Sequence, residues 1–287
     1  MSSYYTLPTL KPPVWTWEVP TYFFVGGVAG AAAVVGAVAR MTGGSPALVR
    51  DARWIAAVGG AASPGLLISD LGRPERFLNM LRVFKLQSPM SVGAWTLVAF
   101  SNTAGAAAFA DALVRITGGR LPVRIVANAA ETLAAASGLV LSTYTGVLIG
   151  ATAVPVWSRN VSLLPIHFGA SGLGGAVSIL ELMGHRDRAL NRIAIGAAAI
   201  ETAIGVAIES RTDPALDSLK WGPSGTITRV GGVLSGPLPL ALRVLGRHSM
   251  NMRRLAAAST IAGSLLTRIG WLAAGKASAS AQAEPPA

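Results

Sequence analysis

Polar and titratable side chains interrupt the apolar runs of this sequence at a few positions. Tyr144 stands in a run of four polar residues, 142–145, and His167 lies at the start of another apolar run. Glu131 and Glu201 also fall inside such runs. An ionisable group in an apolar segment is costly unless it meets a partner or water. These positions are therefore candidates for hydrogen bonding and proton transfer.

The residue counts exclude several other kinds of chemistry. The chain has no cysteine, so it can hold neither a disulfide, a thiolate zinc site, a nucleophilic cysteine nor an iron–sulfur cluster of its own. Of its three histidines only His167 lies in an apolar run. A bis-histidine haem needs two such residues, so we expect no haem, and no metal-binding or catalytic residue is predicted.

The composition is that of a membrane protein. Hydrophobic residues make up 52% of the 287 residues and charged residues 13%, about half of the roughly 25% usual in soluble domains. The net charge of +11 sits in short blocks between apolar runs. Such blocks are typical of the loops of a helical membrane protein in contact with lipid, and we expect no nucleic-acid partner.

Runs of about 20 mainly apolar residues, the length that crosses a bilayer, occur at eight places. We therefore predict an all-α integral membrane protein with eight transmembrane helices. Residues 1–17 precede them, and the Ala-, Ser- and Pro-rich residues 276–287 are predicted to form a disordered tail. The predicted spans are residues 18–40, 51–70, 90–114, 123–150, 159–183, 187–210, 226–246 and 251–274.

Eight spans place both chain ends on one side of the membrane, which we call side A. The opposite side, side B, holds basic residues in each of its four connections. The positive-inside rule then places side B in the cytoplasm. The basic residues of side A are instead concentrated in one segment, within residues 73–85.

A short internal repeat divides the chain. Pro-Val-Trp at 13–15 precedes the first predicted span, and Pro-Val-Trp at 155–157 precedes the fifth. Tyr-Phe at 22–23 and His-Phe at 167–168 follow, each before a glycine pair. The match is short enough to arise by chance, but if real it predicts two four-helix bundles side by side, residues 18–150 and 151–275.

Residues 70–89 are the least membrane-like part of the chain. Gly72 allows a sharp exit from a helix, and Pro74 suits the first turn of the next. Phe77, Leu81 and Phe84 then share one helical face, which predicts a short helix lying flat on side A. This segment is either a connector that touches lipid phosphate or a docking platform for a soluble partner through Arg73, Arg76, Arg82 and Lys85.

Four motifs carry a family resemblance. They are Trp-x-Trp-Glu-x-Pro-x-Tyr-Phe-Phe-x-Gly-Gly at 15–27, Asp-Leu-Gly-Arg-Pro-x-Arg-Phe at 70–77, Ser-Pro-Met-Ser-x-Gly-x-Trp at 88–95 and Tyr-Thr-Gly-Val-Leu-Ile at 144–149. They resemble the NrfD/PsrC family, the membrane subunits of polysulfide-reductase-type complexes. The resemblance covers spans one to five, and the later spans match only as hydrophobic helices.

The resemblance implies a haem-free anchor subunit of a respiratory oxidoreductase in the bacterial plasma (inner) membrane. Such a subunit exchanges electrons between membrane quinone, menaquinone or ubiquinone, and a partner iron–sulfur subunit of the four-cluster ferredoxin type. That partner serves a molybdopterin catalytic subunit. In the family the motif side faces the iron–sulfur partner, so side A is expected to be extracytoplasmic.

A quinone site of this kind would draw on residues near side A. Tyr144 and His167 are the candidate hydrogen-bond donors. The remaining candidates are Trp15, Trp17 and Tyr22 as aromatic walls, Asp70 and Glu18 as proton carriers, and Arg73 paired with Asp70 beside the head group. Protons could come from the cytoplasm through Asn128 and Glu131, with Glu201 lining the second bundle.

Each candidate also has a purely structural interpretation. The tryptophans could form an interfacial aromatic belt, and Tyr144 could pack between helices with its hydroxyl satisfied. A lone buried histidine is often only hydrogen-bonded. Glu131 could be neutral and join two helices, and an Asp70–Arg73 ion pair could simply fix the loop.

Two other functions fit the same sequence. A small secondary transporter would also have a repeat architecture and carboxylates at mid-membrane, although it needs no docking segment such as 70–89. A membrane anchor that binds no quinone would share every feature except the quinone itself.

Overall fold

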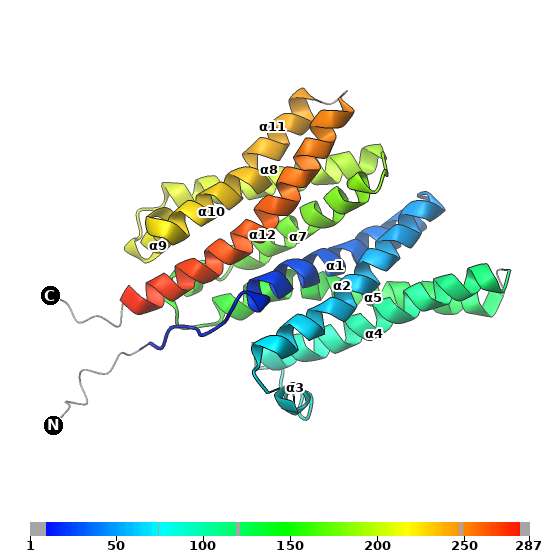
Figure 1. Ribbon diagram of the computed structural model, residues 1–287, viewed down its shortest axis with the longest axis horizontal. Helices are drawn as coiled ribbons and strands as arrows, with labels where there is room; N and C mark the ends of the chain where they lie inside the picture. The colour runs from blue at the N-terminus through cyan, green and yellow to red at the C-terminus, as the bar shows by residue number, and fades with distance from the viewer. Residues whose placement is uncertain (1–9, 74, 119–120, 247–248, 282–287) are drawn as a thin grey trace.

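The computed structural model describes residues 10–73, 75–118, 121–246 and 249–281, and its regular structure within these ranges is entirely helical (Figure 1). The predicted all-α class is confirmed. The helices are α1 (Glu18–Met41), α2 (Pro46–Asp70), α3 (Glu75–Met80), α4 (Pro89–Ile116), α5 (Leu121–Gly150), α6 (Pro155–Ser158), α7 (Leu163–Leu182), α8 (Arg188–Ser210), α9 (Asp217–Lys220), α10 (Gly222–Ser235), α11 (Pro237–Leu245) and α12 (Met250–Ala281).

Six of these helices, α1, α4, α5, α7, α8 and α12, are long and apolar enough to cross a membrane. The chain is thus a multi-pass membrane protein, but the described residues supply six such helices and not the predicted eight. The segment 51–70 lies in α2, whose first turns carry charged side chains such as Arg50 and Asp51. The segment 226–246 is two helices, α10 and α11, and not one.

The break between α10 and α11 falls at Gly236 and Pro237. Pro237 has no N–H to donate and its ring collides with the carbonyl four residues back, so an α-helix cannot continue through it undisturbed. Gly236 takes φ −108° and ψ −96°, and a Cβ there would lie 3.0 Å from the backbone nitrogen of Thr202 on α8. The glycine thus lets the broken segment pack closely on α8.

Serine–proline pairs start two of the long helices. The side chain of Ser45 accepts a hydrogen bond from Leu48 N (3.2 Å) ahead of α2, and Ser88 accepts one from Ser91 N (3.3 Å) ahead of α4. In both cases proline occupies the first helical position, where its missing N–H costs nothing. Gly72, with φ +65°, provides the predicted exit from α2.

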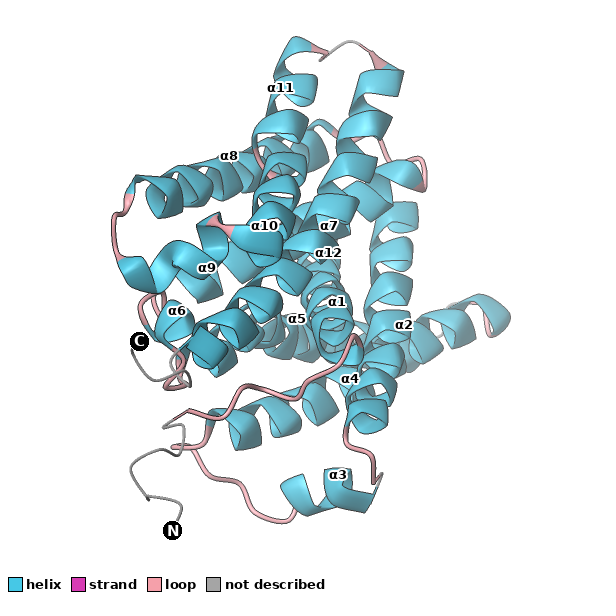
Figure 2. Ribbon diagram, turned by 60° about the vertical axis from the view of Figure 1, so that its left-hand side comes forward, coloured by secondary structure: helices cyan, strands magenta, loops and turns pink. Residues whose placement is uncertain are grey.

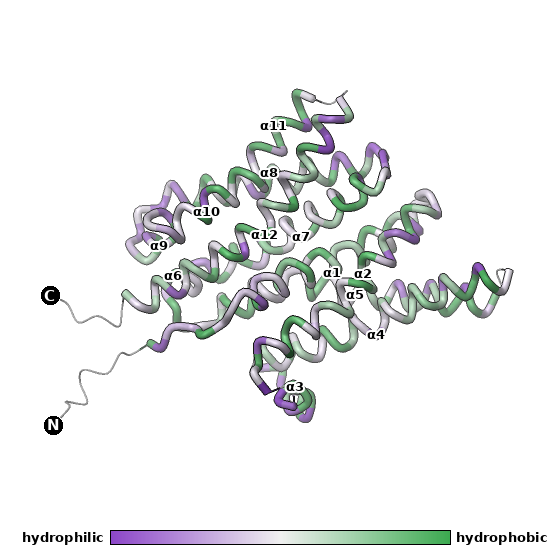
Figure 3. Tube along the Cα trace, in the orientation of Figure 1, coloured by the Kyte–Doolittle hydropathy of each residue, from purple (hydrophilic) through white to green (hydrophobic). Residues whose placement is uncertain are grey.

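The helices pack as two groups. α1, α2, α4 and α5 contact one another, and so do α7, α8, α10, α11 and α12. The groups meet chiefly where α1 packs on α7 and α12 and where α5 packs on α7. In Figure 1 the long helices run in roughly one direction, with the short helices α3 and α9 at one end, and Figure 2 shows α3 lying outside the group of long helices. This end is side A, and Figure 3 shows hydrophilic residues gathered in α3 and near the helix ends.

Equivalent residues of the sequence repeat touch each other across α1 and α7. The rings of Trp15 and Trp157 stack with centroids 5.8 Å apart. The rings of Phe23 and Phe168 lie 6.2 Å apart, and a Cβ at Gly172 would be 2.9 Å from the carbonyl oxygen of Gly27. Contacts between like positions are those expected of two halves related by an approximate two-fold axis.

Two further predictions need correction at their boundaries. Helix α12 continues through Ala281, so residues 276–281 of the predicted tail are helical, while residues 282–287 lie outside the described residues. The predicted side A helix is α3, which is shorter than expected and ends at Met80. Phe77 is buried beneath it but Phe84 is exposed, so the two do not share one helical face. Pro74 lies outside the described residues.

Candidate functional site

A small apolar cavity lies at side A among α1, α2, α4 and α5. We call it the Tyr144 cavity. It measures about 90 Å³, enough for a few water molecules at about 30 Å³ each. It brings together four of the residues predicted for the quinone site, Trp15, Tyr22, Asp70 and Tyr144. Its other lining residues are Val19, Phe23, Leu67, Leu71, Met80, Met90, Gly93, Ala94 and Leu148.

The position of Tyr144 depends on a glycine of the neighbouring helix. A Cβ at Gly93 on α4 would overlap the phenol ring of Tyr144 at its Cζ and hydroxyl. Gly93 therefore makes the space in which the ring lies. Gly93 belongs to the motif at residues 88–95, so its importance could be suspected from the sequence, although the residue it accommodates could not.

Asp70 is fixed by the segment that precedes α1. Its Oδ1 accepts hydrogen bonds from the backbone nitrogen of Thr16 (3.1 Å) and from the Thr16 hydroxyl (2.7 Å). Thr16 also contacts Glu18 through its hydroxyl. The side chains of Asp70, Thr16 and Glu18 thus form a polar connection from the cavity wall to the surface. The ion pair considered between Asp70 and Arg73 is not formed among the described residues.

Two predicted members of this site point elsewhere. Trp17 is 67% exposed and does not line the Tyr144 cavity. Arg73 is exposed at the end of α2. An exposed tryptophan at a helix end on side A fits the interfacial belt that was the alternative interpretation.

His167 lines a different and much larger cavity, which we call the His167 cavity. It measures about 750 Å³ and lies among α7, α8, α10 and α12. Gly146 on α5 packs against the backbone of Leu164 and Pro165 on α7. This contact between α5 and α7 lies between Tyr144 and His167. The prediction that Tyr144 and His167 serve one site is therefore not supported, because the two side chains line separate cavities.

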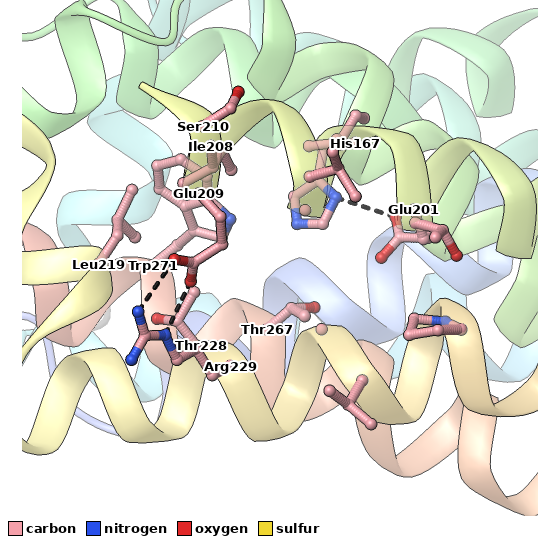
Figure 4. A pocket seen from close by; sticks show the side chains of 17 residues that line it. His167, Glu201, Ile208, Glu209, Ser210, Leu219, Thr228, Arg229, Thr267 and Trp271 are labelled. Carbon is pink, nitrogen blue, oxygen red and sulfur yellow. Dashed lines mark hydrogen bonds and ion pairs between the residues drawn. The ribbon is translucent and has the colours of Figure 1, made fainter. Parts of the chain in front are cut away.

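The inner end of the His167 cavity carries a buried histidine–glutamate pair (Figure 4). Nδ1 of His167 lies 2.9 Å from Oε1 of Glu201, so the imidazole and the carboxylate face each other directly. The second oxygen of Glu201 accepts a hydrogen bond from the Ser235 hydroxyl (2.8 Å). Trp271 packs beside His167 with ring centroids 6.0 Å apart.

The outer end of the same cavity carries a second pair, closer to side A. Nε and Nη2 of Arg229 donate hydrogen bonds to the two carboxylate oxygens of Glu209, at 2.7 and 2.9 Å. This pair is about half exposed. Figure 4 shows this pair close to Trp271 and Thr228 and apart from His167 and Glu201.

Arg268 is a buried cation that sequence reasoning misplaced. The last predicted span ends at residue 274, which would put Arg268 close to the membrane surface. In the structure α12 continues to Ala281, and Arg268 is 1% exposed. Its guanidinium lies 3.8 Å above the ring of Phe168 and donates to the Phe168 carbonyl (2.8 Å). The misplacement followed from the predicted boundary, because the composition of 275–281 resembles a tail.

The predicted proton path starts in a cluster of ion pairs at side B. Glu131 is 1% exposed. Both of its oxygens accept from Arg53, at 3.1 and 2.9 Å, and one also contacts Arg40. Asn128 accepts from Arg53 (3.1 Å). Glu131 is thus held between two guanidinium groups, and Glu201, the third predicted member, lies in the other group of helices.

The predicted docking residues share one exposed segment at side A. Arg73, Arg76, Arg82 and Lys85 are all exposed in the connection between α2 and α4. This connection also supplies Met80 to the wall of the Tyr144 cavity, and Met90 follows at the start of α4. A protein bound to the basic segment would therefore lie directly outside this cavity.

Among the described residues no three histidine, aspartate or glutamate side chains are grouped so as to hold a metal ion.

Comparison with known proteins gives one assignment. A family model described as polysulfide reductase, NrfD_2, matches residues 1–281, which include every element above. No curated protein matches the chain. The family model spans nearly the whole sequence and confirms the resemblance of the four motifs, so the chain belongs to the NrfD family of polysulfide reductase proteins.

Proposed function

We propose that this protein is the membrane anchor subunit of a respiratory oxidoreductase and exchanges electrons between a partner iron–sulfur subunit and membrane quinone at the Tyr144 cavity. The observation that carries the proposal is the meeting of Tyr22, Asp70 and Tyr144 around an apolar cavity directly beneath an exposed basic segment. Family membership supports it.

The lining of the Tyr144 cavity suits a quinone ring, although its volume requires the site to open. Quinone, when bound, supplies a carrier for two electrons and two protons. The hydroxyls of Tyr22 and Tyr144 can donate to its carbonyl oxygens, and Trp15 offers an aromatic wall. Met80 and Met90 form the outer wall, and methionine is flexible enough to move aside for a ring.

Proton exchange would use the short polar connection at side A. Asp70, Thr16 and Glu18 lead from the cavity wall to the surface within one hydrogen-bonded group. The longer path from side B through Asn128 and Glu131 stays a prediction. Two arginines hold both oxygens of Glu131, so this carboxylate is better suited to a structural ion pair than to relaying protons.

The partners follow from the same arrangement. The exposed basic segment from Arg73 to Lys85 would receive the iron–sulfur subunit, of the four-cluster ferredoxin type, which in turn would serve a molybdopterin catalytic subunit. Side B carries the Arg40–Glu131–Arg53 cluster and the more widely spread basic residues. We therefore place side B in the cytoplasm and the docking face outside the bacterial plasma membrane.

The same proposal includes the membrane topology. α2 packs between α1 and α4, and α10 with α11 packs on α8 and α12. We propose that α2 and the α10–α11 pair also cross the bilayer, which completes eight spans in two bundles of four. A lipid-exposed break would leave backbone groups unsatisfied, and the break at Gly236 lies against α8.

A secondary transporter remains the second candidate because one observation favours it. The α10–α11 break lies beside the buried carboxylate of Glu201, which accepts from Ser235, and transporters place broken helices beside their substrate sites. The exposed basic segment has no part in that function. Purification in mild detergent distinguishes the two, because a redox anchor brings a cysteine-rich iron–sulfur subunit with it and a transporter does not.

Replacement of the Tyr144 hydroxyl tests the quinone site. Tyr144→Phe should lower quinone-coupled turnover in membranes by about tenfold, the size of one lost hydrogen bond of about 1.4 kcal/mol, while the complex still assembles. Ser137→Ala is the control, because the Ser137 hydroxyl bonds only to carbonyls of its own helix. Unchanged turnover in Tyr144→Phe would remove Tyr144 from the site.

A further inference from the structure

The His167 cavity has the size and lining of a site for an apolar ring compound. Its volume of about 750 Å³ falls in the range of roughly 300–1,000 Å³ that small-molecule sites occupy. It is about eight times as large as the Tyr144 cavity. Apolar side chains such as Ile204, Ile208 and Leu219 form most of its wall.

The charged groups of the cavity are few and form two pairs, Glu209–Arg229 at the outer end and His167–Glu201 at the inner end. The hydroxyls of Thr202, Thr228 and Thr267 donate to carbonyls of their own helices. The imidazole of His167 faces Glu201 through Nδ1, so Nε2 points away from this carboxylate (Figure 4). With Nδ1–H directed at the carboxylate, Nε2 is the ring nitrogen that can accept a hydrogen bond, which a quinol hydroxyl provides and an acyl chain does not.

The cavity opens sideways toward the apolar surface of the protein. Two of its lining residues, Val206 on α8 and Val233 on α10, are 64% and 52% exposed. The exposed side chains at this opening are those that face lipid in a membrane protein. A ligand dissolved in the bilayer could therefore enter between α8 and α10 without passing the charged pair at the outer end.

The repeat places His167 in register with a residue of the first cavity. Phe23 and Phe168, and likewise Gly27 and Gly172, are 145 positions apart in the sequence and touch across the pseudo-symmetric interface. The same offset relates Tyr22 to His167. Each half of the molecule thus presents a ring side chain with a hydrogen-bonding group to its own cavity near side A.

We propose that the His167 cavity is a second binding site for quinone, separate from the Tyr144 cavity. His167 accepts a hydrogen bond at Nε2 from a hydroxyl of the quinol ring, Glu201 holds the imidazole through Nδ1, and Trp271 contacts the ring face. The isoprenoid tail leaves between α8 and α10. This inference rests on the proposed function for the class of ligand but not for the location, which has its own residues.

Filling the cavity from α8 tests the site. Gly205 lines the cavity, and a Cβ there would meet nothing within 4 Å, so Gly205→Phe can place a ring in the space. Gly196→Phe is the matched control, since Gly196 lies on the same helix, is equally open and lines no part of the cavity. Gly232→Phe fills the same cavity from α10 and replaces Gly205→Phe if that variant lowers protein yield.

The measurement uses the full-length protein with its co-purifying subunits in native membranes. A photoreactive short-chain azidoquinone is cross-linked and mapped by mass spectrometry, and quinone per chain is counted by solvent extraction. We expect two quinones per chain in the wild type and in Gly196→Phe. Gly205→Phe should retain one and lose only the labels on α8, α10 and α12.

Three results would overturn the inference. One quinone per chain in every variant, with label confined to the Tyr144 cavity, removes the second site and leaves the proposed function intact. Release of phospholipid instead of quinone by Gly205→Phe assigns the cavity to lipid. No quinone at either site removes both proposals, whereas label only in the His167 cavity keeps this site and contradicts the proposed function.

Discussion

Single residues decide the geometry of the Tyr144 cavity. The phenol ring of Tyr144 occupies the space that any side chain at Gly93 would fill. The ring and the glycine come from α5 and α4, so the hydroxyl is positioned by the packing of two helices. A change at Gly93 should therefore act on Tyr144 without touching it chemically.

Gly93→Ala should displace the Tyr144 ring and weaken quinone binding by at least as much as Tyr144→Phe does. The added methyl overlaps the ring in its present position, so the hydroxyl must leave the cavity. Binding of a quinone analogue to purified protein measures the effect. Gly105→Ala on the same helix is the control, since a Cβ there meets nothing within 4 Å. Equal affinity in both variants would show that Tyr144 can move without loss.

Glu131 and Glu201 are both buried but differ in their partners, and this difference predicts different roles. Glu131 is held by Arg40 and Arg53, whereas Glu201 meets one histidine and one serine. A carboxylate between two guanidinium groups stabilises the structure as long as all partners are present. Removing it leaves the buried Arg53 with Asp111 as its remaining carboxylate partner and takes from Arg40 the carboxylate that it contacts.

Glu131→Gln should destabilise the protein by roughly 3–5 kcal/mol, the size found when one partner of a buried ion pair is lost. The thermal unfolding midpoint in detergent measures this loss. Glu209→Gln is the comparison, because the Glu209–Arg229 pair is about half exposed and such pairs contribute at most about 1 kcal/mol. Similar midpoints for the two variants would contradict the structural role of Glu131.

At the scale of elements, the connection between α2 and α4 links the predicted docking surface to the Tyr144 cavity. It places four exposed basic residues outside the Tyr144 cavity and provides part of that cavity's wall through Met80. A partner that binds the connection would thus sit beside the proposed quinone site. Movement of the connection would also open or close the cavity.

Arg76→Glu combined with Arg82→Glu should detach the iron–sulfur partner, because the reversed charges repel an acidic docking surface. Co-purification in mild detergent measures attachment. Arg186→Glu with Arg188→Glu makes the same charge change at side B, where both residues are also exposed, and should leave the complex whole. Loss of the partner in both variants, or in neither, would contradict docking at this segment.

The elements that local signals define could be predicted from the sequence. Ser-Pro pairs ahead of α2 and α4 and the glycine exit at Gly72 act within a few residues of themselves. The break at Gly236 was not predicted, because Pro237 stands in an apolar run that otherwise reads as one helix. The separation of Tyr144 from His167 was not predicted either. It depends on how α5 and α7 rotate against each other at Gly146, which sequence spacing alone does not determine.

At the scale of the whole molecule, the two groups of helices meet at positions that the predicted repeat relates. α1 and α7 pack on each other, with α5 and α12 flanking them, and Phe23 of α1 lies against Phe168 of α7. Lipid is as apolar as these helices, so close packing of small residues and not burial from water stabilises the contact. A Cβ at Gly172 would lie 2.9 Å from the carbonyl oxygen of Gly27 and one at Gly175 2.8 Å from Val28, so glycines of α7 allow the two helices to approach closely.

The two halves should therefore assemble without a covalent link. Residues 1–152 and 153–287, expressed together as separate chains, should co-purify, since the division falls in the connection between α5 and α6 and cuts no helix. Gly172→Leu in the second chain should abolish co-purification, because a Cβ there already lies 2.9 Å from the Gly27 carbonyl oxygen and the longer side chain forces α1 and α7 apart. Gly196→Leu, on the exposed face of α8, should leave the pair intact. Co-purification that survives Gly172→Leu would show that α5, α12 and the Trp15–Trp157 stack hold the halves together without the α1–α7 contact.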